Sequence, residues 1–304
     1  MKENKEYIIM PQREKDIFVR GIIPDLNVRF LFANIKETLI EIRNLQNLSI
    51  QCEALLGETI LGAFLLTTRE IKQEHEVIGI HIEGDGAVKK ILAFASSFGG
   101  VRGIIVPEDA SWEGKIYKGK GKGILQVNKF KLNSKKVYSS AVEMRDVPIA
   151  KNLEEYISKS DQINAFIGIY SFYDSNNPLL PVEVYGYFFE VLPDTKIEQI
   201  DKLTNFIYKT DMIEFLKNIF GEQIYEQKKE LKQQFSVRIL QSGSIFFYCD
   251  CNAGKIENVL FTLGKDEVFQ ILEEQKQIEI TCEFCKKKYI FTENDIIRLF
   301  KEKE

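Results

Sequence analysis

The period of the hydrophobic pattern changes several times in the first part of the chain, which indicates a mixture of helices and strands. Residues 35–48 carry apolar side chains at helical spacing, and residues 53–68 form a second, more uniformly apolar helical stretch. Residues 77–83 alternate strictly, with three isoleucines on one face of a predicted strand. Further strands are predicted at 103–106, 124–130, 137–141 and 182–192. These elements predict an α+β core domain, of mixed helices and strands, over residues 1–192.

The following segment, residues 193–240, differs in composition and predicts a helical linker. All seven prolines lie at or before Pro193, and only four of the nineteen glycines follow it. Apolar positions recur at helical spacing along two successive stretches, and they are Ile197, Ile200, Leu203, Phe206 and Ile207, then Ile213, Leu216, Ile219 and Phe220. Isolated helices of this length are marginal in water. The linker is therefore expected to fold only while it packs against a neighbour.

Residues 241–304 are predicted to form a small third domain. A strand at 244–248, helices at 254–263 and 266–274, strands at 278–281 and 289–291, and a last helix at 293–301 are expected. Thr292 and Asp295 have the spacing of a variant capping box at the start of the last helix. A domain of about sixty residues has a marginal core, so a bound metal would stabilise it.

Four of the five cysteines lie in this domain, as Cys249-Asp-Cys251 and Cys282-Glu-Phe-Cys285, with thirty residues between the pairs. Two close-set thiol pairs can make a four-cysteine zinc site or two local disulfides. We predict that the four sulfurs bind one Zn²⁺ per chain in the reduced state. Lys286, Lys287 and Lys288 are expected to offset the charge of the thiolates and to lower the thiol pKa values.

Three other readings of the cysteines stay open on spacing alone. An inert structural zinc knuckle needs the same four ligands. A nucleic-acid-binding zinc ribbon is disfavoured because residues 246–304 carry 9 Lys and Arg against 12 Asp and Glu, a net charge of −3. A thioredoxin-like dithiol should open a helix after a strand, whereas Cys282 and Cys285 lie between two predicted strands.

Charge and hydropathy argue against a nucleic-acid-binding, membrane-bound or secreted protein. The net charge is −4 and the sequence pI is about 5.6, so no attraction to nucleic acid or to an anionic membrane is expected. The N-terminus is too charged for a signal peptide. The longest apolar stretch, 55–66, contains Glu58 and falls short of the roughly 20 residues of a membrane span. We therefore expect a reducing cytoplasm, where paired thiols bind metal or act in redox chemistry.

The segment from Cys249 to Ile296 resembles the C-terminal redox domain of the heat-shock protein 33 family, the redox-regulated holdase chaperones. Both cysteine pairs, the gap between them and the sequence Leu-Gly-Lys-Asp-Glu at 263–267 carry the resemblance. Landmarks similar to those of the family's core domain follow in order at Phe18–Gly21, Gly84–Gly86, Val101–Gly103, Gly119–Gly123 and Ile149–Ile167. One departure is Lys286, which stands where the family commonly has glycine.

The resemblance implies a chaperone and not an enzyme, with unfolded or partly unfolded client proteins as partners and a homodimer in the active state. It implies that oxidation forms the disulfides Cys249–Cys251 and Cys282–Cys285, with loss of the zinc. The domain and the linker would then unfold and expose an apolar client-binding face, for which the candidates are Ile197, Leu203, Phe206, Leu216 and Phe220. Two alternatives remain: a constitutive zinc-stabilised binding module and a dithiol-disulfide oxidoreductase.

Overall fold

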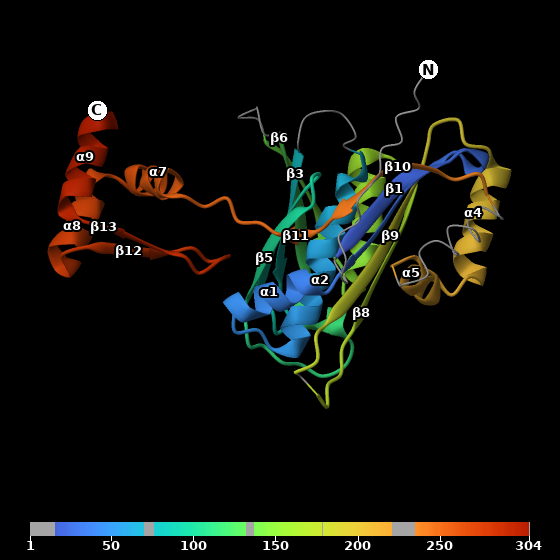
Figure 1. Ribbon diagram of the computed structural model, residues 1–304, viewed down its shortest axis with the longest axis horizontal. Coiled ribbons are helices and arrows are strands. Elements are labelled where there is room, and N and C mark those ends of the chain that lie inside the picture. The colour runs from blue at the N-terminus through green and yellow to red at the C-terminus, as the bar shows by residue number, and fades with distance from the viewer. Residues whose placement is uncertain (1–15, 70–75, 132–136, 178, 221–234, 304) are drawn as a thin grey trace, which may run out of the picture.

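The computed structural model describes residues 16–69, 76–131, 137–177, 179–220 and 235–303. Its elements form a large α+β body and a small C-terminal part, joined by an extended stretch of chain (Figure 1). We call residues 249–303 the cysteine lobe. The α+β fold class is confirmed, whereas the limits of the three predicted domains stay predictions.

The first sheet of the body is antiparallel, and its described strands lie in the order β10, β1, β2, β9 and β8. Their bounds are β1 (Ile17–Ile23), β2 (Val28–Ile35), β8 (Ala165–Phe172), β9 (Glu183–Val191) and β10 (Arg238–Ser244). Along β2, Leu31 and Ala33 belong to the central core, whereas Phe30 and Phe32 belong to a second core on the opposite face. Both faces of β2 are therefore buried.

The second sheet holds the described strands in the order β11, β5, β4, β3, β6 and β7. Their bounds are β3 (Glu76–Gly84), β4 (Lys90–Ser96), β5 (Gly100–Val106), β6 (Gly123–Lys131), β7 (Val137–Met144) and β11 (Phe246–Phe247). Ile78, Ile80 and Ile82 of β3 are each 1% exposed, which confirms the alternation predicted there. Strand β11 is parallel to β5, and the other pairs are antiparallel.

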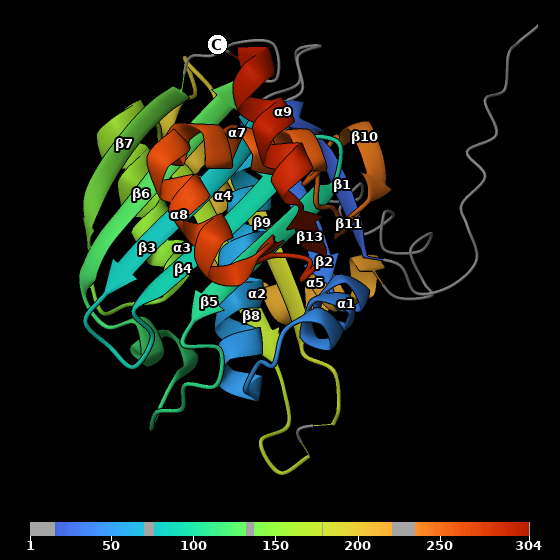
Figure 2. The same cartoon turned by 90° about the vertical axis from the view of Figure 1, so that its left-hand side faces the viewer.

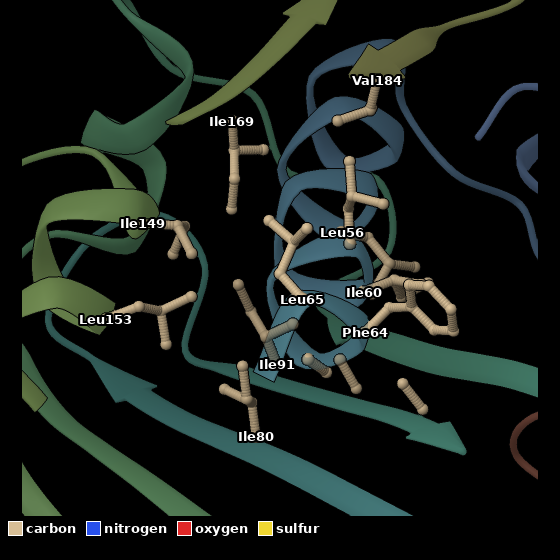
Figure 3. Packing of buried hydrophobic residues seen from close by; sticks show 14 of the residues in the cluster. Leu56, Ile60, Phe64, Leu65, Ile80, Ile91, Ile149, Leu153, Ile169 and Val184 are labelled. Carbon is tan, nitrogen blue, oxygen red and sulfur yellow. The ribbon is translucent and has the colours of Figure 1, made fainter. Parts of the chain in front are cut away.

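Helix α2 (Ile50–Leu65) lies between the two sheets and organises the central core (Figure 3). Its side chains meet Ile91 of the second sheet and Val184 of the first, and the shorter helices α1 (Glu37–Leu45) and α3 (Ile149–Tyr156) flank it. Among the described residues, 50–68 form the one helix long and apolar enough to cross a membrane. Because 89% of that window is buried, it is the core helix of the body.

Two helices, α4 (Ile197–Lys209) and α5 (Met212–Phe220), cover the outer face of the first sheet (Figure 1). We call them the helical cover. Leu203 and Leu216 are fully buried, and the ring of Phe206 packs edge-on against that of Phe189 with centroids 6.4 Å apart. The helices predicted in the linker are therefore present as far as Phe220. Residues 221–234 of the predicted linker lie outside the described residues.

The chain passes from the helical cover to the cysteine lobe through two strands of the body. Strand β10 pairs with β1 at one edge of the first sheet, and β11 pairs with β5 at one edge of the second. Most side chains of β10 are exposed, so main-chain hydrogen bonds hold it in place. The strand predicted at 244–248 is present in two pieces, the end of β10 at Ser244 and β11 at Phe246–Phe247. Ile245 turns the chain from one sheet to the other and donates its N–H to Asp16 O.

The cysteine lobe has a hydrophobic core of its own. Its elements are α7 (Ala253–Leu263), α8 (Lys265–Gln275), β12 (Ile278–Thr281), β13 (Lys288–Phe291) and α9 (Glu293–Lys303). The buried side chains include Leu260, Val268, Leu272, Ile296 and Phe300. The backbone N–H of Thr292 donates to Asp295 Oδ2 at 2.9 Å, which confirms the predicted capping interaction. Each element predicted in this lobe is present within one or two residues of its predicted limits.

Candidate metal centre

The four predicted cysteines converge at one point of the cysteine lobe. Cys249 and Cys251 lie on the extended segment between β11 and α7, whereas Cys282 and Cys285 lie on the loop between β12 and β13. All four sulfurs lie within 4.8 Å of one another. Asn252, which follows Cys251, is the N-cap of α7, and its side chain accepts a hydrogen bond from Lys255 N. This cap positions the chain directly after the first cysteine pair.

The loop that carries the second pair is a tight turn closed by main-chain hydrogen bonds. Lys286 N donates to Cys282 O at 2.8 Å, and Cys282 N donates to Lys287 O at 2.9 Å. Lys286 has a φ of +57°, in the left-handed region that favours glycine. Lys286 is also the position where the resemblance expects glycine, and glycine would adopt this backbone conformation with less strain than lysine does.

The sulfur positions suit a tetrahedral metal ion. Zinc–sulfur bonds of about 2.3 Å in a tetrahedron place the sulfurs about 3.8 Å apart. The Cys249 and Cys282 sulfurs are 3.7 Å apart, and those of Cys251 and Cys285 are 3.3 Å apart. The predicted ligands are thus brought together as a cluster that can hold a metal. Both of these distances join one motif to the other.

The environment of the sulfurs differs from one cysteine to the next. Burial raises the pKa of the Cys249 thiol. Burial acts in the same direction on Cys251, but hydrogen bonds outweigh it, first among them the one that Tyr289 Oη donates to Cys251 Sγ at 3.1 Å, and lower its pKa to about 7. Tyr289 therefore acts on a sulfur directly. The sequence pattern Tyr-x-Phe gave no indication of this role.

The three lysines that follow Cys285 each have a partner other than a cysteine. Lys286 Nζ lies 2.8 Å from Glu108 of the body, and Lys288 Nζ lies 2.7 Å from Glu279 of β12. Lys287 Nζ lies over the ring of Tyr289, 5.2 Å from its centroid. Each ammonium group thus faces another partner, and hydrogen bonds lead the lowering of the Cys251 pKa. The expectation that these lysines, with the bound ion, lower the thiol pKa values stays a prediction.

The cysteine motifs also contact the body through the residues between and beside the cysteines. Asp250, between the first two cysteines, forms ion pairs with Arg102 of β5 and with Lys255. Phe284, between the second two, packs edge-on against Phe94 of β4 with ring centroids 5.8 Å apart. Its carbonyl oxygen accepts a hydrogen bond from Gln46 Nε2 at 3.2 Å. Sequence spacing gave no sign of these long-range partners.

The five candidate residues for a client-binding face divide into two groups. Leu203, Phe206 and Leu216 are buried against the first sheet, and Phe220 is half-buried with its ring 6.4 Å from that of Tyr185. Ile197 differs, because it lies at the first turn of α4 with 77% of its surface exposed. The structure therefore places four of the five on the covered face and Ile197 outside it.

Comparison with known proteins gives a consistent assignment over nearly the whole chain. The family model described as Hsp33 protein matches residues 16–292. A 33 kDa chaperonin of Desulforamulus reducens is 29% identical over 95% of this chain and 99% of its own length. A 33 kDa chaperonin of Thermodesulfovibrio yellowstonii is 26% identical over 94% of this chain and 99% of its own.

A solved structure agrees with this result. The crystal structure of the 33 kDa chaperonin, an Hsp33 homologue, from Thermotoga maritima superposes with a TM-score of 0.79 at 25% identity, and the match covers 96% of this chain and 99% of that one. The two cysteine pairs, the fold and the family match point the same way. The resemblance noted in the sequence is confirmed: this chain belongs to the Hsp33 family, a family of chaperones and not of enzymes.

Proposed function

We propose that this protein is an ATP-independent holdase that oxidation of Cys249, Cys251, Cys282 and Cys285 activates. The observation that carries the proposal is the convergence of these four sulfurs in a lobe whose contacts with the body are made by residues within and beside the same two motifs. A change at the sulfurs therefore acts on the attachment of the lobe as well as on its fold.

In the reduced state, the four cysteines hold one Zn²⁺ per chain. Soft thiolate ligands in a tetrahedral set select zinc among the common divalent ions. When bound, the ion supplies a cross-link between the β12–β13 loop and the segment before α7. Structural zinc sites of this kind contribute on the order of 10 kcal/mol to folding.

Oxidation removes these ligands. With hydrogen peroxide as the oxidant, two thiols and one peroxide give one disulfide and two waters, so the four cysteines consume two peroxides. The family resemblance implies the pairs Cys249–Cys251 and Cys282–Cys285. Such local pairs leave the two motifs unconnected, whereas pairs between the motifs would keep the lobe cross-linked. The local pairs implied by the resemblance would therefore restrain the unfolded lobe less than pairs between the motifs.

Unfolding of the lobe then loosens the linker. Strand β10 lies between the lobe and the helical cover, and its exposed side chains give it little stabilisation beyond main-chain hydrogen bonds. Once the lobe no longer anchors the chain after β11, β10 separates from β1. The helical cover loses that tether and presents Leu203, Phe206, Leu216 and Phe220 to unfolded client proteins. In this mechanism the disordered state is the active one.

Two further properties are part of the proposal. A reducing cytoplasm is the expected compartment, since four free thiols have to persist there until an oxidant appears. A homodimer is the expected active form, on the family resemblance alone. Both are open to direct measurement by fractionation of cells and by analytical ultracentrifugation.

The test is a comparison of the reduced, zinc-loaded protein with the same protein after peroxide treatment, each mixed with a thermally unfolding client such as citrate synthase. Light scattering reports aggregation, and zinc release and free thiols are counted in the same samples. Protection only after oxidation, with loss of one zinc and four thiols and reversal by dithiothreitol, supports the switch. Equal protection in both states would instead identify a constitutive zinc-stabilised binding module.

A further inference from the structure

A second apolar surface lies on the other side of the body from the helical cover, beneath the loop that carries Cys282 and Cys285. We infer that this surface, formed by Phe94, Phe98 and Arg102 on the second sheet, binds segments of unfolded protein that pair an aromatic side chain with an acidic one. The inference rests on the proposed function. We call this surface the β4–β5 surface; while the lobe is docked, Phe284 occupies it.

Phe284 of the lobe contacts both Phe94 and Arg102 of the β4–β5 surface. Its ring packs against Phe94 at an interplanar angle of 78°, and the guanidinium carbon of Arg102 lies 5.1 Å from its centroid. The same guanidinium lies 5.3 Å from the ring of Phe94. Arg102 therefore lies close to both rings, a cation–π arrangement that favours an aromatic occupant over an aliphatic one.

An acidic residue of the lobe also binds to the β4–β5 surface. Asp250 pairs with Arg102 from the segment that carries the first two cysteines. The β4–β5 surface thus holds one aromatic side chain and one carboxylate, supplied by two segments of this chain. When both segments leave, Arg102 offers its planar cation and Phe94 its ring to another chain with the same two groups.

The surface continues into a hollow beside the docked loop. Its lining includes Val77, Phe98, Val101 and Tyr248 together with Phe94 and Arg102. Phe98 is half-buried and packs against Tyr248 with ring centroids 5.4 Å apart. Because Tyr248 immediately precedes Cys249, movement of the cysteine segment widens this hollow. Room for further apolar side chains of a client therefore appears together with the release of Phe284.

The β4–β5 surface and the helical cover lie on opposite sides of the body. Figure 2 shows α7, α8 and α9 in front of the second sheet, and Figure 1 shows α4 and α5 beyond the first. Two further contacts with the body frame Phe284: Gln46 Nε2 donates a hydrogen bond to its carbonyl oxygen at 3.2 Å, and Lys286 forms an ion pair with Glu108. A client held at both surfaces would contact opposite faces of the body.

The inference is tested on the full-length protein with reduced, carboxymethylated α-lactalbumin as the unfolded probe. Phe284→Ala leaves the four sulfurs unchanged and removes only the ring on the β4–β5 surface. In the reduced, zinc-loaded state it should bind the probe about five-fold more tightly than the wild type. Ile290→Ala is the control, because Ile290 lies on the same hairpin but is 54% exposed, and it should bind as the wild type does.

The oxidised protein gives the decisive comparison. Phe94→Ala should weaken binding of the probe to the oxidised protein by about five-fold, and it should abolish the gain made by Phe284→Ala in the reduced double variant. Unchanged binding of oxidised Phe94→Ala would overturn the inference while leaving the proposed function intact. A wild type that fails to bind the probe after oxidation would overturn the proposed function itself.

A photo-crosslinker in place of Phe98 gives an independent readout that does not depend on the stability of the Phe94 variant. With benzoylphenylalanine at this position, crosslinks to the probe should form after oxidation and be blocked in the reduced, docked state. Crosslinks that form equally in both states, or in neither, would contradict the inference. Benzoylphenylalanine in place of Leu179, which is 85% exposed in the loop before β9 and belongs to neither surface, reports nonspecific collisions with the probe.

Discussion

The two sheets of the body are covered in different ways. The helical cover lays two amphipathic helices on the first sheet and buries Leu203, Phe206 and Leu216 in an aromatic-rich core. The cysteine lobe contacts the second sheet through Phe284 and through two exposed or half-exposed ion pairs. One contact is broad and apolar, and the other is small and largely polar.

The helical cover and the cysteine lobe are therefore held to the body by different amounts of free energy. Burial of each large apolar side chain contributes about 1.5–3 kcal/mol, so the helical cover is held by several such terms. An exposed ion pair contributes about 0–1 kcal/mol. The lobe contact is therefore weak and the helical cover is held strongly. In the proposed mechanism, chemistry at the sulfurs controls the lobe contact, and loss of the tether releases the helical cover.

The largest effect is expected when the metal ligands are removed. Cys282→Ser/Cys285→Ser should lose the metal and, with it, on the order of 10 kcal/mol of stabilisation in the lobe. Hydrogen exchange measured by mass spectrometry should become fast throughout residues 249–303, while α2 stays protected. Cys52→Ala, which removes a buried thiol of the body, should leave the metal bound. Slow exchange in the lobe of the double variant would show that its own core suffices.

A smaller effect is expected from a cavity under the helical cover. The ring of Phe206 contacts those of Phe189, Phe215 and Phe235, so Phe206→Ala should destabilise the cover by about 3 kcal/mol. Exchange in α4 and α5 should then be about 100-fold faster, with exchange in the lobe unchanged. Tyr208→Ala on the exposed face of α4 should change little. Equal acceleration in the lobe would mean that the two regions open as one unit.

Removal of a single hydroxyl next to the sulfurs should affect the lobe alone. Tyr289→Phe deletes the hydrogen bond that helps to hold the pKa of Cys251 at about 7, so this pKa should rise. Protons then compete better for the sulfur, and metal release should begin at higher pH. Affinity for zinc at pH 7 should fall about tenfold, measured by competition with a chelator. Tyr248→Phe serves as the control, and an unchanged release midpoint in Tyr289→Phe would contradict the role of the hydroxyl.

The smallest effect is expected from salt. Raising the ionic strength from about 0.1 M to about 1 M shortens the Debye length from about 10 Å to about 3 Å. This should weaken the Arg102–Asp250 and Lys286–Glu108 pairs and leave the helical cover in place. Small-angle X-ray scattering should report a modest increase in radius of gyration as the lobe undocks more often. The increase should disappear in Arg102→Gln/Glu108→Gln, and a salt response that persists there would place its origin elsewhere.

Sequence patterns predicted the two regions unequally, for physical reasons. The lobe's elements followed from local signals, because each lies within a few residues of a cysteine, a cap or a glycine. The strand β3 followed from its alternation. Strands β1 and β2 were missed because both faces of these two strands are largely buried, so their apolar runs lack the polar alternation that marks a half-buried strand. Strand β10 was missed for the opposite reason, since its side chains are mostly exposed.

The sequence predicted the four cysteines of the candidate metal site, but it did not predict the contacts between the cysteine lobe and the body. Cysteine spacing identified the four sulfurs, because metal-binding motifs are local in sequence. The partners of the lobe on the body, Gln46, Arg102 and Glu108, lie 148 or more residues away from the residues that they contact. Such pairs become apparent only when the fold brings them together. Tyr289 was available to sequence reasoning, but nothing in its spacing showed that its hydroxyl reaches a sulfur.

The pairing of β1 with β10 also has a consequence for how the protein is made. Phe18 lies opposite Gly243, so the two strands are separated by most of the chain. During synthesis on the ribosome, β1 and β2 emerge early, whereas the strand that completes their sheet emerges only after the helical cover. The free edge of β1 is a template for pairing with other chains throughout that interval. A member of a chaperone family thus passes through a stage of its own biosynthesis in which one of its sheet edges is exposed to aggregation.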